Sequence, residues 1–248
     1  GIDFFAEDPA PKVNAALLAA GEPFTDPEFD VSTVTIGGRR MLAGILTEQD
    51  LANPIVHPGG ENHHHFEFAA SNMCEWRRIS DPEGFEEWEG RPAVVFDESV
   101  SAADINQGSV GCCWLCALFS ATASAAPEIV RTALSPNVGV SPSGCYSVRL
   151  LVDGSPAFML LDDYVLCRRD NGIRGEAINM HSTNPCEVWP RLLEKAFAKL
   201  AGGYLNLEGD MPRRYEEDVD SAIWFTGAEK YAFVNFQEER GSGRGKKQ

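Results

Sequence analysis

The sequence contains no apolar run that approaches the roughly 20 residues needed by a membrane-spanning helix. It also has no positively charged and then apolar leader at its start. These absences predict a soluble protein without a transmembrane segment. With 248 residues, 44% of them hydrophobic, the chain is large enough to bury one substantial core. We therefore expect a globular protein.

Positive charge is scarce, because 21 lysines and arginines face 37 aspartates and glutamates, which leaves a net charge of −16. This balance argues against nucleic acid and acidic lipid surfaces as partners, since both attract basic patches. It fits calcium or a protein partner with a basic face, although an acidic surface also serves solubility alone. Residues 233–248 end in a short basic stretch and are predicted to be a flexible, solvated tail.

The seven cysteines are odd in number and have no regular spacing. They are Cys74, Cys112, Cys113, Cys116, Cys145, Cys167 and Cys186. This usage predicts free thiols in a reducing compartment, and hence a cytoplasmic location. Cys113 and Cys116 form a C-x-x-C pair, but no second pair completes a zinc site. We expect Cys116 to be a small core residue, with a redox role as the alternative.

A candidate nucleophile lies at Cys113. The apolar stretch 114–123 contains neither glycine nor proline and predicts a buried helix. Gly111 permits a tight turn just before it, so Cys113 would occupy the first helical turn, where unpaired N–H groups and the helix dipole favour a thiolate. Gln107 lies six residues upstream, and its side-chain amide could join the Cys113 backbone N–H as donors to a developing oxyanion.

Several blocks in this order resemble the calpain family of papain-like cysteine proteases. They are residues 104–108 with 111–114, Leu161-Asp162-Asp163-Tyr164, Glu187-Val188-Trp189 with 192–199, and Phe225-Thr226-Gly227. The resemblance implies that Cys113 is the catalytic cysteine and Gln107 the oxyanion-hole glutamine. It also implies that residues 74–232 form the first protease-core subdomain. This chain differs from the family at one position of the motif. Calpains usually carry Asp directly before the nucleophile, whereas this chain has Cys112.

A thiol protease of this type also needs a histidine as base and an asparagine to orient it. In papain-like chains these lie roughly 130–150 residues beyond the cysteine. The only histidine after Cys113 is His181, 68 positions further on. In calpains the two residues belong to a second subdomain, and nothing after Phe225 resembles it. The chain is thus expected to hold half of an active site, with His181 as a loop or packing residue.

His63, His64 and His65 precede Cys113 by about 50 residues, the His-to-Cys spacing of caspases, but the caspase cysteine motif is absent. A solvated loop is the favoured interpretation of this run, and a transition-metal site is the alternative.

The remaining patterns predict an α+β fold. Residues 31–36 and 41–46 are typical of a hairpin, although residues 1–73 as a whole contain none of the family's blocks and are treated as an extension of unknown role. A second hairpin is expected from 145–152 and 157–166. Residues 187–200 carry an apolar stripe at helical spacing and end at Gly202-Gly203, which predicts an amphipathic helix with a glycine stop.

The resemblance further implies calcium binding. In calpains an aspartate nine residues before the nucleophile and a glutamate opening the later helix hold calcium, and these correspond to Asp104 and Glu187. The alternative is that Asp104 caps a turn and that Glu187 is a charge at a helix N-terminus.

Three functions remain open. The favoured one is a catalytically incomplete calpain-like protein used for interaction or scaffolding. Some small calpain-related proteins that have lost catalytic residues associate with cytoskeleton or flagella, so the resemblance implies a cytoskeletal partner and a cytoskeletal or flagellar location. The second is part of an active endopeptidase whose His and Asn lie in a continuation or a partner chain. The third is a calcium-responsive module without chemistry.

Overall fold

The computed structural model describes residues 2–36, 39–46, 74–81, 83–134, 139–169, 175–207 and 219–227. Its helices are α1 (Ala10–Ala20), α4 (Cys113–Ala125), α5 (Pro127–Ala133), α6 (Trp189–Ala201) and α7 (Val219–Thr226). Its strands are β1 (Thr33–Ile36), β2 (Arg39–Leu42), β3 (Cys74–Arg78), β4 (Cys145–Val152), β5 (Ser155–Asp162) and β6 (Tyr164–Arg168). Short 3₁₀ helices lie at Ala43–Ile45, Glu86–Trp88, Ala102–Asp104 and Tyr204–Leu207. Helices and small antiparallel ladders together make this an α+β fold, as the sequence predicted.

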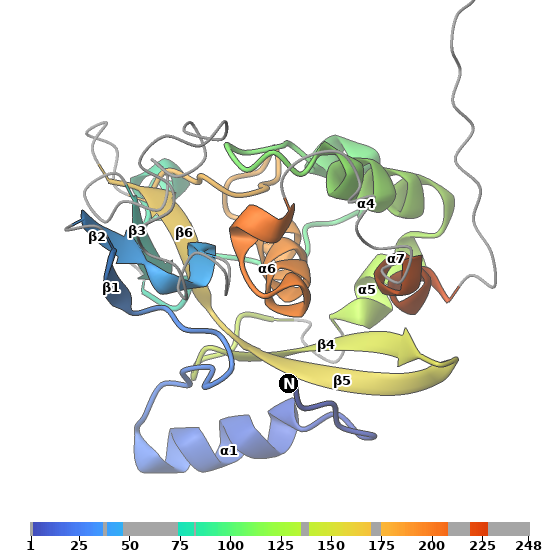
Figure 1. Cartoon of the computed structure of the whole chain (residues 1–248), viewed down its shortest axis with the longest axis horizontal. Coiled ribbons are helices and arrows are strands. Elements are labelled where there is room, and N and C mark those ends of the chain that lie inside the picture. The colour runs from blue at the N-terminus through green and yellow to red at the C-terminus, as the bar shows by residue number, and fades with distance from the viewer. Residues whose placement is uncertain are drawn as a thin grey trace, which may run out of the picture.

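The described strands pair in three antiparallel ladders, β1 with β2, β3 with β6, and β4 with β5. In the longest ladder Cys145 faces Asp162 and Val152 faces Ser155. The hairpin turn has Asp153 and Gly154 at φ of 50° and 75°, the left-handed conformations that a tight two-residue turn requires. In Figure 1 this ladder lies between α1 on one side and α6 on the other.

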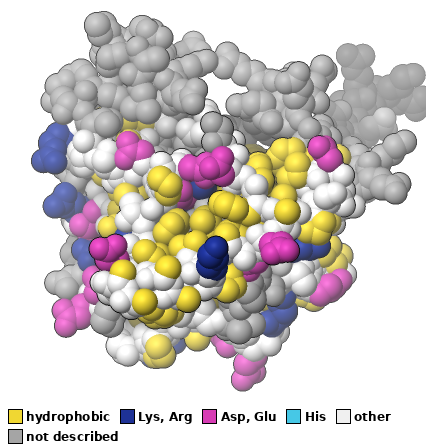
Figure 2. Space-filling model, turned by 90° about the horizontal axis from the view of Figure 1, so that it is seen from below, with side chains coloured by type: hydrophobic (Ala, Val, Ile, Leu, Met, Phe, Trp, Pro, Cys, Tyr) yellow, Lys and Arg dark blue, Asp and Glu magenta, His cyan; other side chains and the backbone are white. Residues whose placement is uncertain are grey.

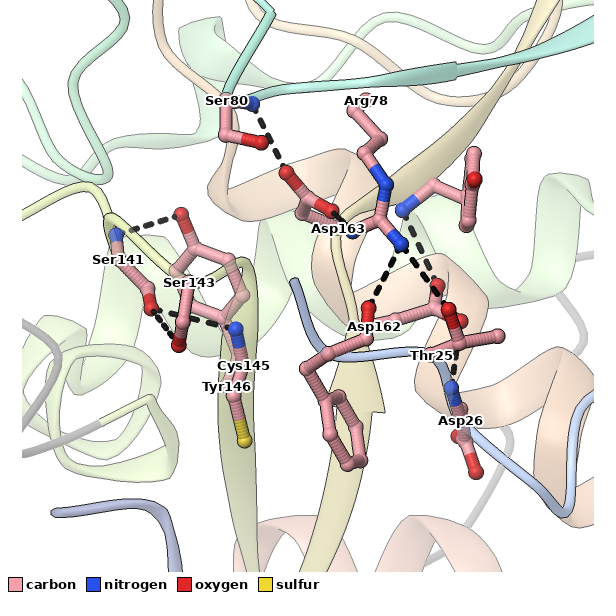
Figure 3. Close-up of polar contacts among 12 residues, drawn as sticks. Thr25, Asp26, Arg78, Ser80, Ser141, Ser143, Cys145, Tyr146, Asp162 and Asp163 are labelled. Carbon is pink, nitrogen blue, oxygen red and sulfur yellow. Dashed lines mark hydrogen bonds and ion pairs between the residues drawn. The ribbon is translucent and has the colours of Figure 1, made fainter. Parts of the chain in front are cut away.

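Both predicted hairpins are present, but their strand limits differ. The expected second strand, 157–166, is divided at Asp163, so that β5 pairs with β4 and β6 pairs with β3. The division follows from the Asp163 carboxylate, which accepts hydrogen bonds from Arg78 at 2.6 Å and from the backbone N–H of Ser80 at 2.8 Å (Figure 3). These bonds tie the chain to β3 at the point where it leaves β4.

Helix α6 is the centre of the molecule (Figure 1), and every residue from Trp189 to Lys199 is buried. The sequence predicted it over residues 187–200, and it ends as expected at Gly202, which has a left-handed φ of 79°. Phe197 of this helix packs on Phe119 of α4, with ring centroids 5.3 Å apart, and Phe119 packs on Phe225 of α7 at 5.1 Å. The aromatic cluster fixes α4, α6 and α7 together.

Two buried lysines of α6 join segments that are distant in sequence. Lys195 forms an ion pair with Asp162 and donates to the carbonyl oxygen of Tyr164 at 2.7 Å. Lys199 pairs with Asp26 at 2.8 Å and with Glu28 at 2.9 Å. The N-terminal segment is therefore bonded into the core.

Further bonds in Figure 3 attach the same segment to the strands. The backbone N–H of Asp26 donates to the Asp162 carboxylate at 2.8 Å. Arg78, which pairs with Asp163, also donates to the carbonyl oxygen of Phe24 at 2.8 Å and to the Thr25 hydroxyl at 3.0 Å.

Helix α1 was not predicted from the sequence. It begins with Pro11 in its first turn and ends at Gly21, whose φ is 70°. Its outward side is apolar, and Figure 2 shows hydrophobic side chains gathered on this face of the molecule. Leu18 is 53% exposed, and Phe4 and Phe5 nearby in sequence are 37% and 38% exposed.

No single helix in the described ranges is long and apolar enough to cross a membrane. Helices α4 and α5 reach the length only together, and a bend of 114° separates them.

Candidate active site

Cys113 is the first residue of α4 and its side chain is exposed. The preceding Cys112 is the N-cap residue, is fully buried, and caps no N–H group with its side chain. The first N–H groups of a helix have no intrahelical partners, and the Cys112 side chain does not satisfy them here. The structure thus places an accessible thiol where the sequence predicted a nucleophile.

The loop before α4 is held by backbone bonds to residues 178–181. Asn106 and His181 exchange two backbone hydrogen bonds, at 2.9 and 3.1 Å, and the N–H of Ser109 donates to Ile178 at 2.6 Å. Gly108 makes this approach possible, because a Cβ atom there would lie 1.9 Å from the carbonyl oxygen of Ile178. The glycine is thus needed for close contact between two backbones.

Gln107 is exposed, and its side-chain amide donates to the carbonyl oxygen of Val110 at 3.0 Å. A primary amide has two N–H donors, so this bond engages one and leaves the other for a developing oxyanion. The bond fixes the Gln107 side chain to the loop that leads into Cys113. The residue predicted as the oxyanion donor therefore lies on a loop of defined conformation.

Beneath the helix start, Glu194 of α6 connects two parts of the site. Its carboxylate accepts a hydrogen bond from the Cys112 thiol at 3.2 Å and another from the backbone N–H of Met180 at 2.9 Å. Burial raises the pKa of Glu194 to about 7, and the two hydrogen bonds only partly oppose this rise. The contact of Glu194 with Cys112 was not predicted from the sequence, because Glu194 appeared there only as part of the helical block 192–199.

Cys112 and Cys116 interact through their thiols. The Cys112 thiol has one proton, which it can give either to Glu194 or to Cys116, and its interaction with Cys116 lowers the pKa of that half-buried thiol. The pKa of Cys112 is strongly raised by the bond to Cys116, by burial and by the charge of Glu194. Cys112 therefore stays protonated, and Cys116 is the member of the pair that ionises.

His181 is the one histidine within the described ranges. Its ring Nδ1 lies 3.1 Å from the carbonyl oxygen of Asn179, so Nδ1 carries the proton and donates it. Among the described residues no hydrogen bond joins His181 to the Cys113 thiol. His63, His64 and His65 lie outside the described residues, so the structure does not place them.

The two predicted calcium ligands both make hydrogen bonds. Asp104 accepts the backbone N–H of Ser101 at 2.6 Å in a capping box. Glu187 is buried and accepts the N–H of Asp97 at 2.8 Å and the Ser182 hydroxyl at 2.6 Å. Burial raises the pKa of Glu187, and the nearby charges of Asp104 and Asp97 raise it further. Negative charge thus accumulates at this corner.

The side chains of this corner do not by themselves complete a metal site. In the part of the chain that the structure describes, no group of three or more His, Cys, Asp or Glu side chains converges to hold a metal ion. Any further ligands for a cation here would have to be backbone carbonyls or water.

A family model described as "Calpain family cysteine protease" matches residues 60–239. The chain is 31% identical over 200 residues to "Calpain-type cysteine protease ADL1" of Oryza sativa subsp. japonica, which covers 80% of this chain and 8% of that protein. It is 34% identical over 134 residues to "Calpain" of Schistosoma mansoni, covering 53% and 17%.

A third relative is "Calpain-1 catalytic subunit" of Mus musculus, 26% identical over 220 residues that cover 84% of this chain and 28% of that protein. The chain spans less than a third of the length of each of these relatives.

Proposed function

This chain belongs to the calpain family of cysteine proteases, and we propose that it carries the nucleophile half of a cysteine endopeptidase site and, by itself, binds a protein partner without hydrolysing it. The observation that carries the proposal is the exposed Cys113 thiol at the start of α4, to which no described histidine is hydrogen-bonded. His181, the histidine that the described ranges include, donates to Asn179 instead.

The chemistry of such a half-site is limited. A thiolate at a helix N-terminus reacts with strong electrophiles, and Gln107 with the Cys113 N–H would stabilise an oxyanion. Peptide hydrolysis also requires a proton for the leaving amine and a base to activate water, and a histidine supplies both in this class of enzyme. Without it, an acyl-enzyme would form slowly and persist.

We test this with casein cleavage and with an epoxysuccinyl thiol-protease inhibitor. The 248-residue chain should cleave casein no faster than its Cys113→Ala variant. The inhibitor should label Cys113 only slowly, at the same rate with and without millimolar calcium, and the Cys113→Ser variant sets the background. Cleavage that depends on Cys113 would overturn the proposal.

For the partner we propose a cytoskeletal protein, in the cytoplasm or a flagellum, that presents a basic face. The net charge of −16 supports a basic surface on the other side of the interface. Co-sedimentation with an isolated cytoskeleton or a flagellar axoneme, at low and high salt, measures this. Binding that weakens as salt rises supports the proposal, and failure to sediment with either preparation overturns it.

The second candidate is part of an active endopeptidase whose His and Asn come from a continuation or a partner chain. The unused second donor of the Gln107 amide and the accessibility of Cys113 favour it, because both remain available for catalysis. Mixing the chain with a separate polypeptide that holds the His and Asn subdomain of a calpain is the test. Casein cleavage that appears only in the mixture, and is lost in Cys113→Ala, would establish this candidate over the first.

Calcium regulation is a further part of the proposal. Asp104 and Glu187 are the side chains that would hold the ion, with their remaining lone pairs as donors. The accumulated negative charge at Glu187 supports a cation there, and the ion would neutralise it. Isothermal titration with calcium should show binding that Asp104→Asn weakens and that Asp3→Asn, an exposed carboxylate elsewhere, leaves unchanged. Equal binding by both variants would place any calcium at another site.

A further inference from the structure

Three cysteines surround the start of α4 at three depths. Cys113 is exposed, Cys116 is half-buried one turn later, and Cys112 is completely buried and donates to Glu194. The proposed function uses only Cys113. The C-x-x-C pair and the buried thiol beside it therefore need a separate explanation.

The spacing of Cys113 and Cys116 permits a disulfide. Residues three apart on an α-helix have Cα atoms about 5 Å apart, because the rise is 1.5 Å and the rotation 100° per residue. Disulfides span Cα separations of about 4.4–6.8 Å. Cys113 is the first residue of α4, and the N–H of Cys116 donates to the carbonyl oxygen of Cys112 at 3.1 Å, so the pair has this helical spacing.

The surroundings favour Cys116 as the attacking thiolate. The interaction with the Cys112 thiol, whose one proton can go to Cys116 or to Glu194, lowers the pKa of Cys116. Cys112 itself is kept as a thiol, because the interaction with Cys116, burial and the charge of Glu194 all raise its pKa. A packing role was expected for Cys116 from the sequence, and its helical spacing from the exposed Cys113 favours the redox alternative.

We propose that Cys113 and Cys116 are a hydroperoxide-reactive thiol pair that closes to a reversible disulfide. The Cys113 thiolate attacks the terminal oxygen of the hydroperoxide, the O–O bond breaks, and a Cys113 sulfenic acid and an alcohol, or water from hydrogen peroxide, are formed. The Cys116 thiolate then attacks the sulfenic sulfur, the S–S bond forms, and hydroxide leaves and takes up a proton as water. Two thiols are oxidised and one peroxide is reduced.

The consequence of the reaction is protection of Cys113. A sulfenic acid without a nearby thiol proceeds to the irreversible sulfinic acid, whereas a disulfide returns to two thiols with a thiol reductant such as glutathione. While it lasts, the disulfide removes the nucleophile of the half-site. Oxidation of this thiol pair does not require Cys113 to cleave a peptide. The proposal can therefore be tested separately from the proposed function.

The experiment treats the full 248-residue chain with stoichiometric hydrogen peroxide and then with an alkylating reagent and trypsin. Mass spectrometry of the fragment that contains all three cysteines should show the loss of two hydrogens, and dithiothreitol should reverse it. Dimedone, which traps sulfenic acids, should label wild type weakly. The Cys116→Ser variant should form no disulfide and should instead give a dimedone adduct and a sulfinic acid at Cys113.

Three further variants identify which two cysteines form the disulfide. Cys113→Ala should form no disulfide in this fragment, Cys112→Ala should still form one but more slowly, and Cys186→Ala, a buried cysteine elsewhere, should behave as wild type. Thermal unfolding of each variant verifies that it is folded. A disulfide that persists in Cys113→Ala would assign the bond to Cys112 and Cys116 and overturn the proposal. So would equal dimedone labelling of wild type and Cys116→Ser.

Discussion

Glu194 accepts a hydrogen bond from the thiol of Cys112 across 3.2 Å, at a depth in the core where both side chains are buried. The bond joins the central helix α6 to the N-cap of α4, and so to the residue beside the nucleophile. The geometry of the site therefore depends on whether the Glu194 carboxyl group is ionised.

The first prediction concerns pH. The folded-state pKa of Glu194 is raised from 4.5 to about 7, so the folded chain holds a proton that the unfolded chain has lost between these values. The contribution of Glu194 to stability is therefore fully present below pH 4.5 and is lost as pH rises toward 7, on the order of 3 kcal/mol in total. Urea unfolding at pH 5 and pH 7.5 measures the loss.

Glu194→Gln should remove this part of the pH dependence, because an amide does not titrate. Glu7→Gln, at an exposed position, is the matched control and should keep the wild-type profile. If wild type and Glu194→Gln lose the same free energy of unfolding between the two pH values, Glu194 is not the group responsible.

The second prediction concerns the buried ion pair of Lys199. Replacing Lys199 by Met leaves the Asp26 carboxylate buried without its counter-charge, which costs about 3–5 kcal/mol of the free energy of unfolding. Lys12→Met, at an exposed position of α1, should change stability by less than about 0.5 kcal/mol. Chemical denaturation of both variants tests this prediction. If Lys199→Met and Lys12→Met unfold at the same denaturant concentration, the Lys199–Asp26 pair contributes nothing to stability.

The third prediction concerns Gly108. An alanine there would place its Cβ 1.9 Å from the Ile178 carbonyl oxygen and 2.5 Å from that of Asn179, so the loop must move away from residues 178–181. We expect a loss of roughly 1–3 kcal/mol or more in stability, together with altered reactivity of Cys113. Gly139→Ala is the control, because a Cβ atom added there would meet no other atom within 4 Å, and it should be nearly neutral. Similar unfolding midpoints for the two variants would contradict the close approach.

The fourth prediction concerns the order of thiol labelling. Under native conditions iodoacetamide should modify Cys113 first, because it is exposed, and Cys116 more slowly, because it is half-buried. The five buried cysteines should react only after unfolding. Time-resolved peptide mass spectrometry gives the order, and early modification of Cys145 or Cys167 would show that the core opens readily.

Some of this structure could be predicted from local sequence. The helix over α4 followed from an apolar run free of glycine and proline, and the stop of α6 at Gly202 followed from a glycine pair. Such features depend on neighbours along the chain, so periodicity and turn residues reveal them. The missed helix α1 also had a local signal, a proline followed by an alanine- and leucine-rich run.

Other features depend on residues far apart in sequence and could not be predicted in this way. Lys195 and Glu194 are charged and would be expected on the outer face of an amphipathic helix, yet both are fully buried. Their burial is possible only because Asp162 and Cys112, from other elements, lie opposite them. No local pattern indicates which partner will stand across the core.

The bonds from residues 24–28 to α6 limit which part of the gene could be transferred on its own. A gene fragment that began at residue 60, where the family match starts, would encode α6 but would leave Lys199 inside the protein without Asp26 and Glu28. Such a fragment would be a poor unit for exon shuffling or gene fusion, because the product would bury an uncompensated cation. Selection should therefore transmit the N-terminal segment together with the core as one block.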